Sequence, residues 1–145
     1  MAKVYALSVK QPWATLLVHG LKTVEVRRWP TARRGRVLIH AARVPDERPE
    51  GWARVPPEME PLARQLGGIV GSAELADCVP YRSVDAFLRE RDKHLNEADW
   101  YSPPVLYGFH FRSPELIPFT AYSGWMRFFP VDWTEPAKLE PPAAS

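Results

Sequence analysis

The chain has 145 residues, of which 46% are hydrophobic, enough to bury the core of one domain of common size. Its single cysteine, Cys78, excludes a disulfide framework within a monomer, and the N-terminus lacks the apolar run of a signal peptide, so a cytoplasmic location is expected. No stretch approaches the roughly 18 apolar residues that cross a bilayer, so no membrane partner is expected.

The first half of the chain carries strand patterns on either side of one helix pattern. Pro12 suits the first helical position and Gly20 the position just past a helix end, which predicts a short helix over 12–19. Polar residues that alternate with valines over 22–28 predict a half-exposed strand. The other elements of this half are two strands and a proline-rich loop, expected at 4–9, 36–42 and 44–57.

The second half combines two helix patterns with three strand patterns. Met59, Leu62 and Leu66 indicate one helix, and Ser83 is the expected N-cap of another. The strands are expected at 69–79, 105–112 and 125–131, with a loop from 96 to 104.

Five or six strands with two or three short helices predict an α+β fold, a small mixed barrel and not a parallel doubly wound sheet. We expect one domain over residues 1–133, followed by a Pro- and Ala-rich tail at 134–145.

The net charge of +2 conceals an asymmetry along the chain. Residues 1–45 hold nine Lys or Arg against a single acid, Glu25, a net charge of +8, which leaves −6 for the remainder. A basic first third predicts a positive face for an anionic partner, with nucleic acid as the first candidate. The alternative is an arginine-rich surface that pairs with acids from the other half of the chain, and charge alone does not decide between the two.

Common signatures of metal and phosphate sites are missing from the sequence. The four histidines are far apart, and neither Cys-x-x-Cys nor His-Glu-x-x-His spacing occurs. The glycines at 67, 68 and 71 lack the Lys-Ser/Thr of a phosphate-binding loop, and Cys78 reads as a core residue. We therefore expect neither a metal nor a cofactor.

One block of sequence is more informative than the rest. It contains Gln-Pro-Trp-Ala at 11–14, Gly-x-Lys-x-x-Glu-x-Arg at 20–27 and Arg-Gly-x-x-x-Ile-His-Ala at 34–41. Together with Gly-x-x-Gly-x-x-Glu at 68–74 and Tyr-Gly-Phe at 107–109, this block resembles the ASCH domain, in a bacterial branch of small stand-alone proteins. The resemblance spans about residues 4–132 and implies a PUA-like barrel. It also implies a cleft lined by Lys22 and Glu25, and a role on RNA or a modified nucleotide.

Strand geometry supports a site in this block independently of the resemblance. Glu25 and Arg27 are two residues apart, so their side chains leave the same face of a strand and can form a hydrogen-bonded pair. Lys22 has the opposite parity and joins them only if it lies on the turn after Gly20. Trp13 or Trp29 could stack on a base. In the simpler interpretation the charges form a structural ion pair and Trp13 belongs to the core.

The sequence leaves more than one function open. RNA binding is favoured over catalysis, with the expected binding residues Lys10, Gln11, Trp13, Lys22, Glu25, Arg27, Arg28, Trp29 and His40. If the chain is a hydrolase of RNA or of a modified nucleoside, Lys22 and Glu25 are the expected catalytic residues. The related acetylcytidine amidohydrolases place a Thr three residues after the Lys, where this chain has Glu25, and the adjacent Thr23 would point to the other side. A protein-interaction domain is the third possibility.

Overall fold

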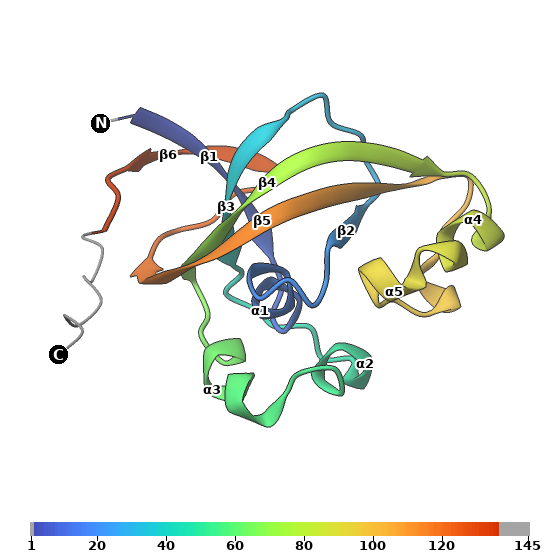
Figure 1. The fold of residues 1–145 in the computed structure, drawn as a ribbon, viewed down its shortest axis with the longest axis horizontal. Coiled ribbons are helices and arrows are strands. Elements are labelled where there is room, and N and C mark those ends of the chain that lie inside the picture. The colour runs from blue at the N-terminus through green and yellow to red at the C-terminus, as the bar shows by residue number, and fades with distance from the viewer. Residues whose placement is uncertain (1, 137–145) are drawn as a thin grey trace, which may run out of the picture.

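The computed structural model describes residues 2–136 and shows one mixed sheet that curves around short helices (Figure 1). The strands are β1 (Ala2–Val9), β2 (Val24–Arg27), β3 (Gly35–Ala41), β4 (Gly68–Tyr81), β5 (Leu106–Ala121) and β6 (Phe128–Trp133). The helices are α1 (Trp13–Val18), α2 (Pro49–Trp52), α3 (Glu60–Ala63), α4 (Val84–Arg89) and α5 (Arg91–His94), with 3-10 turns η1 (Pro57–Met59) and η2 (Ala98–Trp100). Residues 137–145 of the predicted tail lie outside the described residues.

The six strands follow the order β2-β5-β4-β3-β1-β6. β1 runs parallel to β3, and all the other neighbouring strands are antiparallel. The predicted α+β class and mixed sheet are therefore confirmed. A closed barrel is not, because β2 and β6 remain the two outer strands of this order.

Side chains nevertheless connect β2 with β6 and with β1, at the other end of the strand order. Trp29, which follows β2, packs edge-to-face on Phe128 of β6 with the ring centroids 5.6 Å apart. Arg27 of β2 donates a hydrogen bond to the Ser8 carbonyl of β1 at 2.7 Å. The end of the sheet where these contacts lie also carries the candidate site.

The main core lies between the sheet and α1. Every residue of α1 is buried, and this helix packs against β3, β4 and β5. Gly71 of β4 permits the close approach, because a Cβ atom at this position would lie 2.4 Å from the Val18 side chain. A smaller cluster around Tyr81 and Phe87 lies beneath α4 and fixes the helical segment that follows β4.

Several boundaries differ from the sequence predictions. In the pattern at Met59, Leu62 and Leu66, the first residue lies in η1, the second in α3 and the third beyond both. The proline-rich loop contains α2, because helices of one turn leave no detectable periodicity. The predicted strand at 105–112 continues to Ala121, and the one predicted at 125–131 begins only at Phe128. No helix among the described residues is long and apolar enough to cross a membrane.

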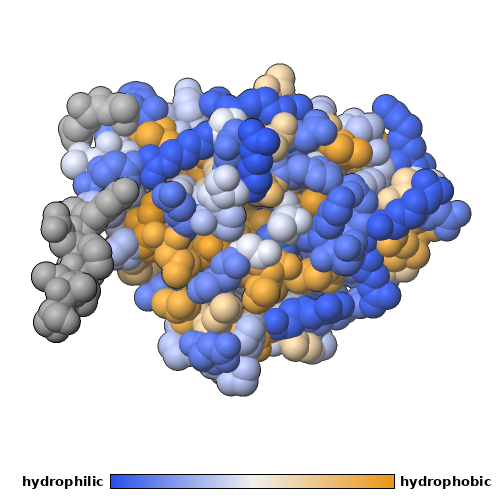
Figure 2. Space-filling view, in the orientation of Figure 1, coloured by the Kyte–Doolittle hydropathy of each residue, from blue (hydrophilic) through white to orange (hydrophobic). Residues whose placement is uncertain are grey.

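One face of the molecule exposes apolar side chains. Figure 2 shows them gathered at the end of β5 and beside α1. The exposed members include Leu62, Leu116 and Phe119, which line a hollow of about 470 Å³. This hollow shares no lining residue with the polar cleft described next, so the two surfaces are separate features.

Candidate functional site

A cleft of about 780 Å³ opens where β1, α1, β2 and η2 meet the loop at 122–127. Four of the six tryptophans of the chain contribute to its lining. They are Trp13, Trp29, Trp100 and Trp125. Five basic residues also line the cleft, against the two carboxylates Glu25 and Asp46, so its charged lining has a net charge of +3. The basic residues are Lys10, Lys22, Arg27, Arg48 and Arg127.

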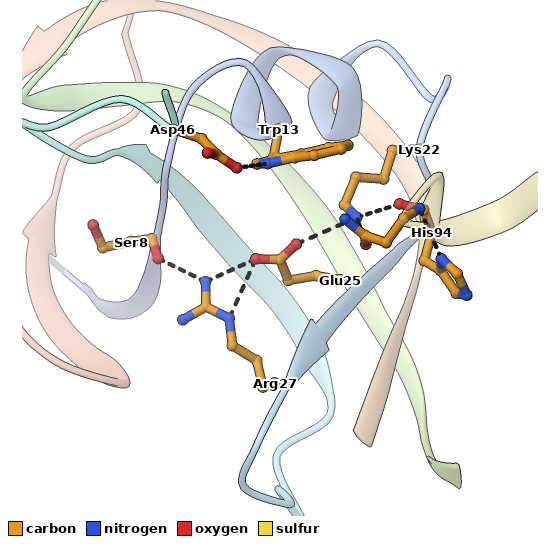
Figure 3. A network of polar contacts seen from close by, with 8 residues as sticks. Ser8, Trp13, Lys22, Glu25, Arg27, Asp46 and His94 are labelled. Carbon is orange, nitrogen blue, oxygen red and sulfur yellow. Dashed lines mark hydrogen bonds and ion pairs between the residues drawn. The ribbon is translucent and has the colours of Figure 1, made fainter. Parts of the chain in front are cut away.

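Lys22, Glu25 and Arg27 form one connected group (Figure 3), which contains the Glu25 and Arg27 pair that the sequence predicted. The Lys22 Nζ lies 3.5 Å from one Glu25 carboxylate oxygen. Arg27 donates to the other oxygen from Nε at 3.2 Å and from a terminal nitrogen at 2.9 Å. Lys22 precedes β2 and lies on the turn after Gly20, which is the condition under which its opposite parity allows this meeting. The carboxylate is thereby held from both sides.

Lys22 is buried, and its ammonium group has further partners. Its side chain is 1% exposed, and Nζ donates to the His94 carbonyl at 2.6 Å and to Asn96 Oδ1 at 3.3 Å. The same nitrogen lies 4.7 Å from the centre of the Trp13 ring. Burial lowers the pKa of Lys22 from 10.5 to about 8, although the neighbouring Glu25 opposes this shift. An ammonium has three donors, and His94, Asn96 and Glu25 provide an acceptor for each of them.

The partners of Lys22 are themselves fixed by the helical segment after β4. The His94 ring stacks on Phe87 with the centroids 4.0 Å apart, and Nε2 lies 2.7 Å from the Phe87 carbonyl. Since a carbonyl only accepts, Nε2 carries the proton, and the Asn96 N–H donates to Nδ1 at 3.0 Å. Burial lowers the pKa of His94, which favours this neutral form. Segments about 70 residues apart in sequence are joined in this way.

Trp13 belongs to the core, as the simpler interpretation expected, and also forms part of the cleft lining. Its ring is 4% exposed. The indole Nε1 donates to Asp46 at 2.9 Å, and the ring packs edge-to-face against Trp100. Trp13 therefore forms a fixed wall of the cleft.

Three of the nine predicted binding residues do not line the cleft. The Gln11 side chain is buried, accepts from the Thr15 N–H and donates to two carbonyls of the α3 segment, which makes it a structural residue. Arg28 is exposed and lines a neighbouring hollow. His40 hydrogen-bonds Ser8 Oγ at 3.1 Å and the Tyr122 carbonyl at 2.7 Å. The other six predicted residues are among those that line the cleft.

The sequence interpretation missed ten of the sixteen residues that line the cleft. Asp46 and Arg48 come from the proline-rich loop, and Asn96 and Trp100 come from the predicted loop before β5. The loop at 122–127 adds Trp125, Met126 and Arg127. Trp125 and Arg127, close together in one loop, were the available signal. The ring contacts themselves join distant segments: Arg48 lies over Trp100, at 4.5 Å from the ring centre, and Arg127 lies over Trp29 at 5.1 Å.

The alternative in which the basic first third pairs with acids of the other half is partly correct. Arg34 pairs with Asp77 at 3.7 Å, and Arg36 pairs with Glu135. Lys10 lines the cleft and forms no ion pair with any residue of the described part of the chain. The positive charge is therefore partly neutralised along the outside of the sheet and retained at the cleft.

The curved mixed sheet with its short helices defines a small α+β domain of the PUA-like class. The chain belongs to the ASCH domain family, whose model matches residues 7–138. The crystal structure of ASCH from Zymomonas mobilis has a TM-score of 0.59 at 19% identity, covering 81% of this chain and 72% of that one. A Tyr-to-Phe mutant of the same protein has a TM-score of 0.61 at 19% identity, covering 83% and 76%. These likenesses establish the fold.

A shorter and closer likeness links the chain to activating signal cointegrator 1. The human protein is 60% identical over 37 residues, and the mouse protein is 57% identical over 37 residues. The matched segment covers 26% of this chain and 6% of either relative, so the chain spans only a small part of their length.

Proposed function

We propose that this ASCH domain binds single-stranded RNA by taking an unpaired base into the cleft. The observation that carries the proposal is the lining, in which four tryptophans surround a surface with a net charge of +3. Aromatic walls suit the faces of bases, and basic side chains suit the phosphates between them. The association of the family with RNA, implied by the resemblance, supports the same conclusion.

Glu25 provides the cleft with a hydrogen-bond acceptor for the edge of a base. Its carboxylate is held by Lys22 and Arg27, and its side chain is 11% exposed, so it faces the cleft with a fixed orientation. A carboxylate only accepts hydrogen bonds, and the exposed edges of adenine, cytosine and guanine carry amino donors. We therefore expect a base that presents an N–H group to Glu25 to be preferred over one that presents only acceptors.

Binding should be of micromolar affinity and should weaken with salt. Each phosphate neutralised on a single strand contributes a slope of about −0.7 to a plot of log affinity against log salt concentration. Trp125 is 73% exposed, so Trp125→Ala should leave the fold intact while it removes a stacking surface worth about 1–3 kcal/mol of binding. Isothermal titration calorimetry with a randomised single-stranded RNA pool, at several salt concentrations, measures both the salt slope and the affinity lost in the variant.

Leu116→Ala is the matched control, since Leu116 is also apolar and exposed but lies in the separate apolar hollow. This variant should bind RNA like the wild type. Equal affinity at low and high salt, or equal loss in both variants, would count against RNA binding in the cleft.

A hydrolase acting on RNA or a modified nucleoside is the second candidate, and one contact favours it. The Tyr122 carbonyl near His40 Nε2 places the ring proton on that nitrogen, which leaves Nδ1 free to accept the Ser8 hydroxyl proton at 3.1 Å. Burial lowers the pKa of His40, so the ring is a neutral base. Ser8 lines the cleft and Thr23 does not, so Ser8 is the better candidate for a nucleophile.

If the domain only binds RNA, no product should form beyond that in a control without protein. Incubation of concentrated protein with acetylated cytidine, and separately with single-stranded RNA, should release neither cytidine nor shorter fragments on chromatography. Product that increases with protein concentration and disappears in Ser8→Ala would establish the hydrolase instead. Product lost in Lys22→Met but not in Ser8→Ala would identify the lysine, despite its three engaged donors, as the reactive group.

A further inference from the structure

Two further hollows adjoin the cleft, one on each side. The first, of about 630 Å³, shares Arg27, Trp29 and Trp100 with the cleft, as well as Val26 and Arg48. The second, of about 420 Å³, shares Ser8, Trp125 and Met126 with it. The two side hollows have no lining residue in common, so the cleft lies between them. The three hollows form one track across the open end of the sheet.

Each side hollow has an arginine that the cleft does not use. Arg28 lines the first and Arg43 lines the second, and both side chains are exposed. Neither forms an ion pair with a described residue, unlike Arg34 and Arg36 on the outside of the sheet. The lining of the second hollow holds no carboxylate, and that of the first holds one, Asp99. The track therefore continues the positive charge of the cleft in both directions.

Tryptophan side chains separate the cleft from each of the two side hollows. Trp29 and Trp100 stand between the cleft and the first hollow, and Trp125 stands between the cleft and the second. A base can stack on a ring face that no arginine covers, as on the exposed Trp125, whereas a base pair within a duplex has both faces covered by its neighbours. The rings suit the bases of one strand, and the arginines suit its phosphates.

We propose that the ligand is a strand of about three nucleotides, with the middle base in the cleft and one neighbour in each side hollow. Arg28 and Arg43 would then contact the phosphates that flank the middle nucleotide. This inference rests on the proposed function and deepens it. A free nucleoside or mononucleotide would occupy the cleft alone and would leave both side hollows empty.

Titration with oligonucleotides of increasing length tests the track. The probes are the four 5′-monophosphates and single-stranded RNA homopolymers of three and five residues. The affinity should increase by about tenfold or more for each added residue that reaches a side hollow, and should level off beyond three. Arg28→Ala and Arg43→Ala should each reduce the salt slope for the pentanucleotide by about 0.7 and leave monophosphate binding unchanged.

Arg82→Ala serves as the matched control, because Arg82 is exposed and lines none of the three hollows. It should alter neither the affinity nor the salt slope. If monophosphates bind as tightly as pentanucleotides, or if the slope is the same in all three variants, the track is wrong while RNA recognition by the cleft stands. If no probe binds at any length, the proposed function fails as well.

Discussion

The free energy of unfolding of a Glu25→Gln variant is expected to be about 3 kcal/mol lower than that of the wild type. Gln keeps the shape of the side chain and removes its charge, so Lys22 remains buried without its anion. Arg27 at the same time loses the charge behind its two hydrogen bonds. Breaking one partner of a buried ion pair costs about 3–5 kcal/mol, and we expect the lower end because Glu25 faces the cleft. Urea denaturation at pH 7 measures the difference.

The chain contains a matched control for this substitution. Glu74 also accepts from an arginine, Arg112, at 2.8 Å, but both groups lie on the surface. Exposed ion pairs are screened by water and contribute little, so Glu74→Gln should leave the unfolding free energy essentially unchanged. A similar loss in both variants would mean that burial does not set the strength of the Glu25 contacts. No loss in either would show that the Lys22, Glu25 and Arg27 group is not structural.

The part of the site that the sequence could predict is the part that lies close together in the chain. Glu25 and Arg27 share a face because side chains alternate along a strand, and the structure places both on β2. For Lys22 the alternation supplies only a condition, since the pattern extends the strand to residue 22 and the structure begins β2 only at Val24. Local rules of this kind apply wherever a segment makes its own contacts.

The part that could not be predicted depends on long-range packing. Trp13 and Asp46 are hydrogen-bonded although they are 33 residues apart in the sequence, and Lys22 and Asn96 are 74 residues apart. No local sequence pattern encodes contacts at such separations. Gln11 illustrates the opposite error. It lies in the most informative motif, yet its side chain holds α1 to the α3 segment and does not line the cleft. A motif residue can thus serve the scaffold of a site instead of its ligand.

The edge of the sheet shows why fold class was easier to predict than closure. The number and type of strands follow from hydrophobic patterning, which the six observed strands confirm. Whether the outer strands join depends on their register and curvature. Here the rings of Trp29 and Phe128 are in contact, but β2 and β6 are not paired as strands. The open end that results is where the cleft forms.

The stability of the protein should depend on Lys22 in a pH window above neutrality. Its pKa is about 8 in the folded protein against 10.5 ordinarily, so between these values the unfolded chain binds more protons at this residue. The contribution of Lys22 to the free energy of unfolding must then increase with pH, by at most about 1.4 kcal/mol per pH unit. Below pH 8 the cost of burying the charged ammonium is constant. Above pH 10.5 it is absent.

The contribution of Lys22 can be isolated by comparison with Lys22→Met, in which the other groups still titrate. The difference in unfolding free energy, wild type minus variant, should rise steadily from pH 7.5 to pH 9.5 in urea titrations. Higher pH should be avoided because burial raises the pKa of Tyr81, which makes stability fall as pH passes 10. Lys93 is the opposite case, since its hydrogen bond to Glu90 raises its pKa, and Lys93→Met should give no such rise. A flat or falling difference for Lys22→Met would show that Lys22 is not buried as a charged group.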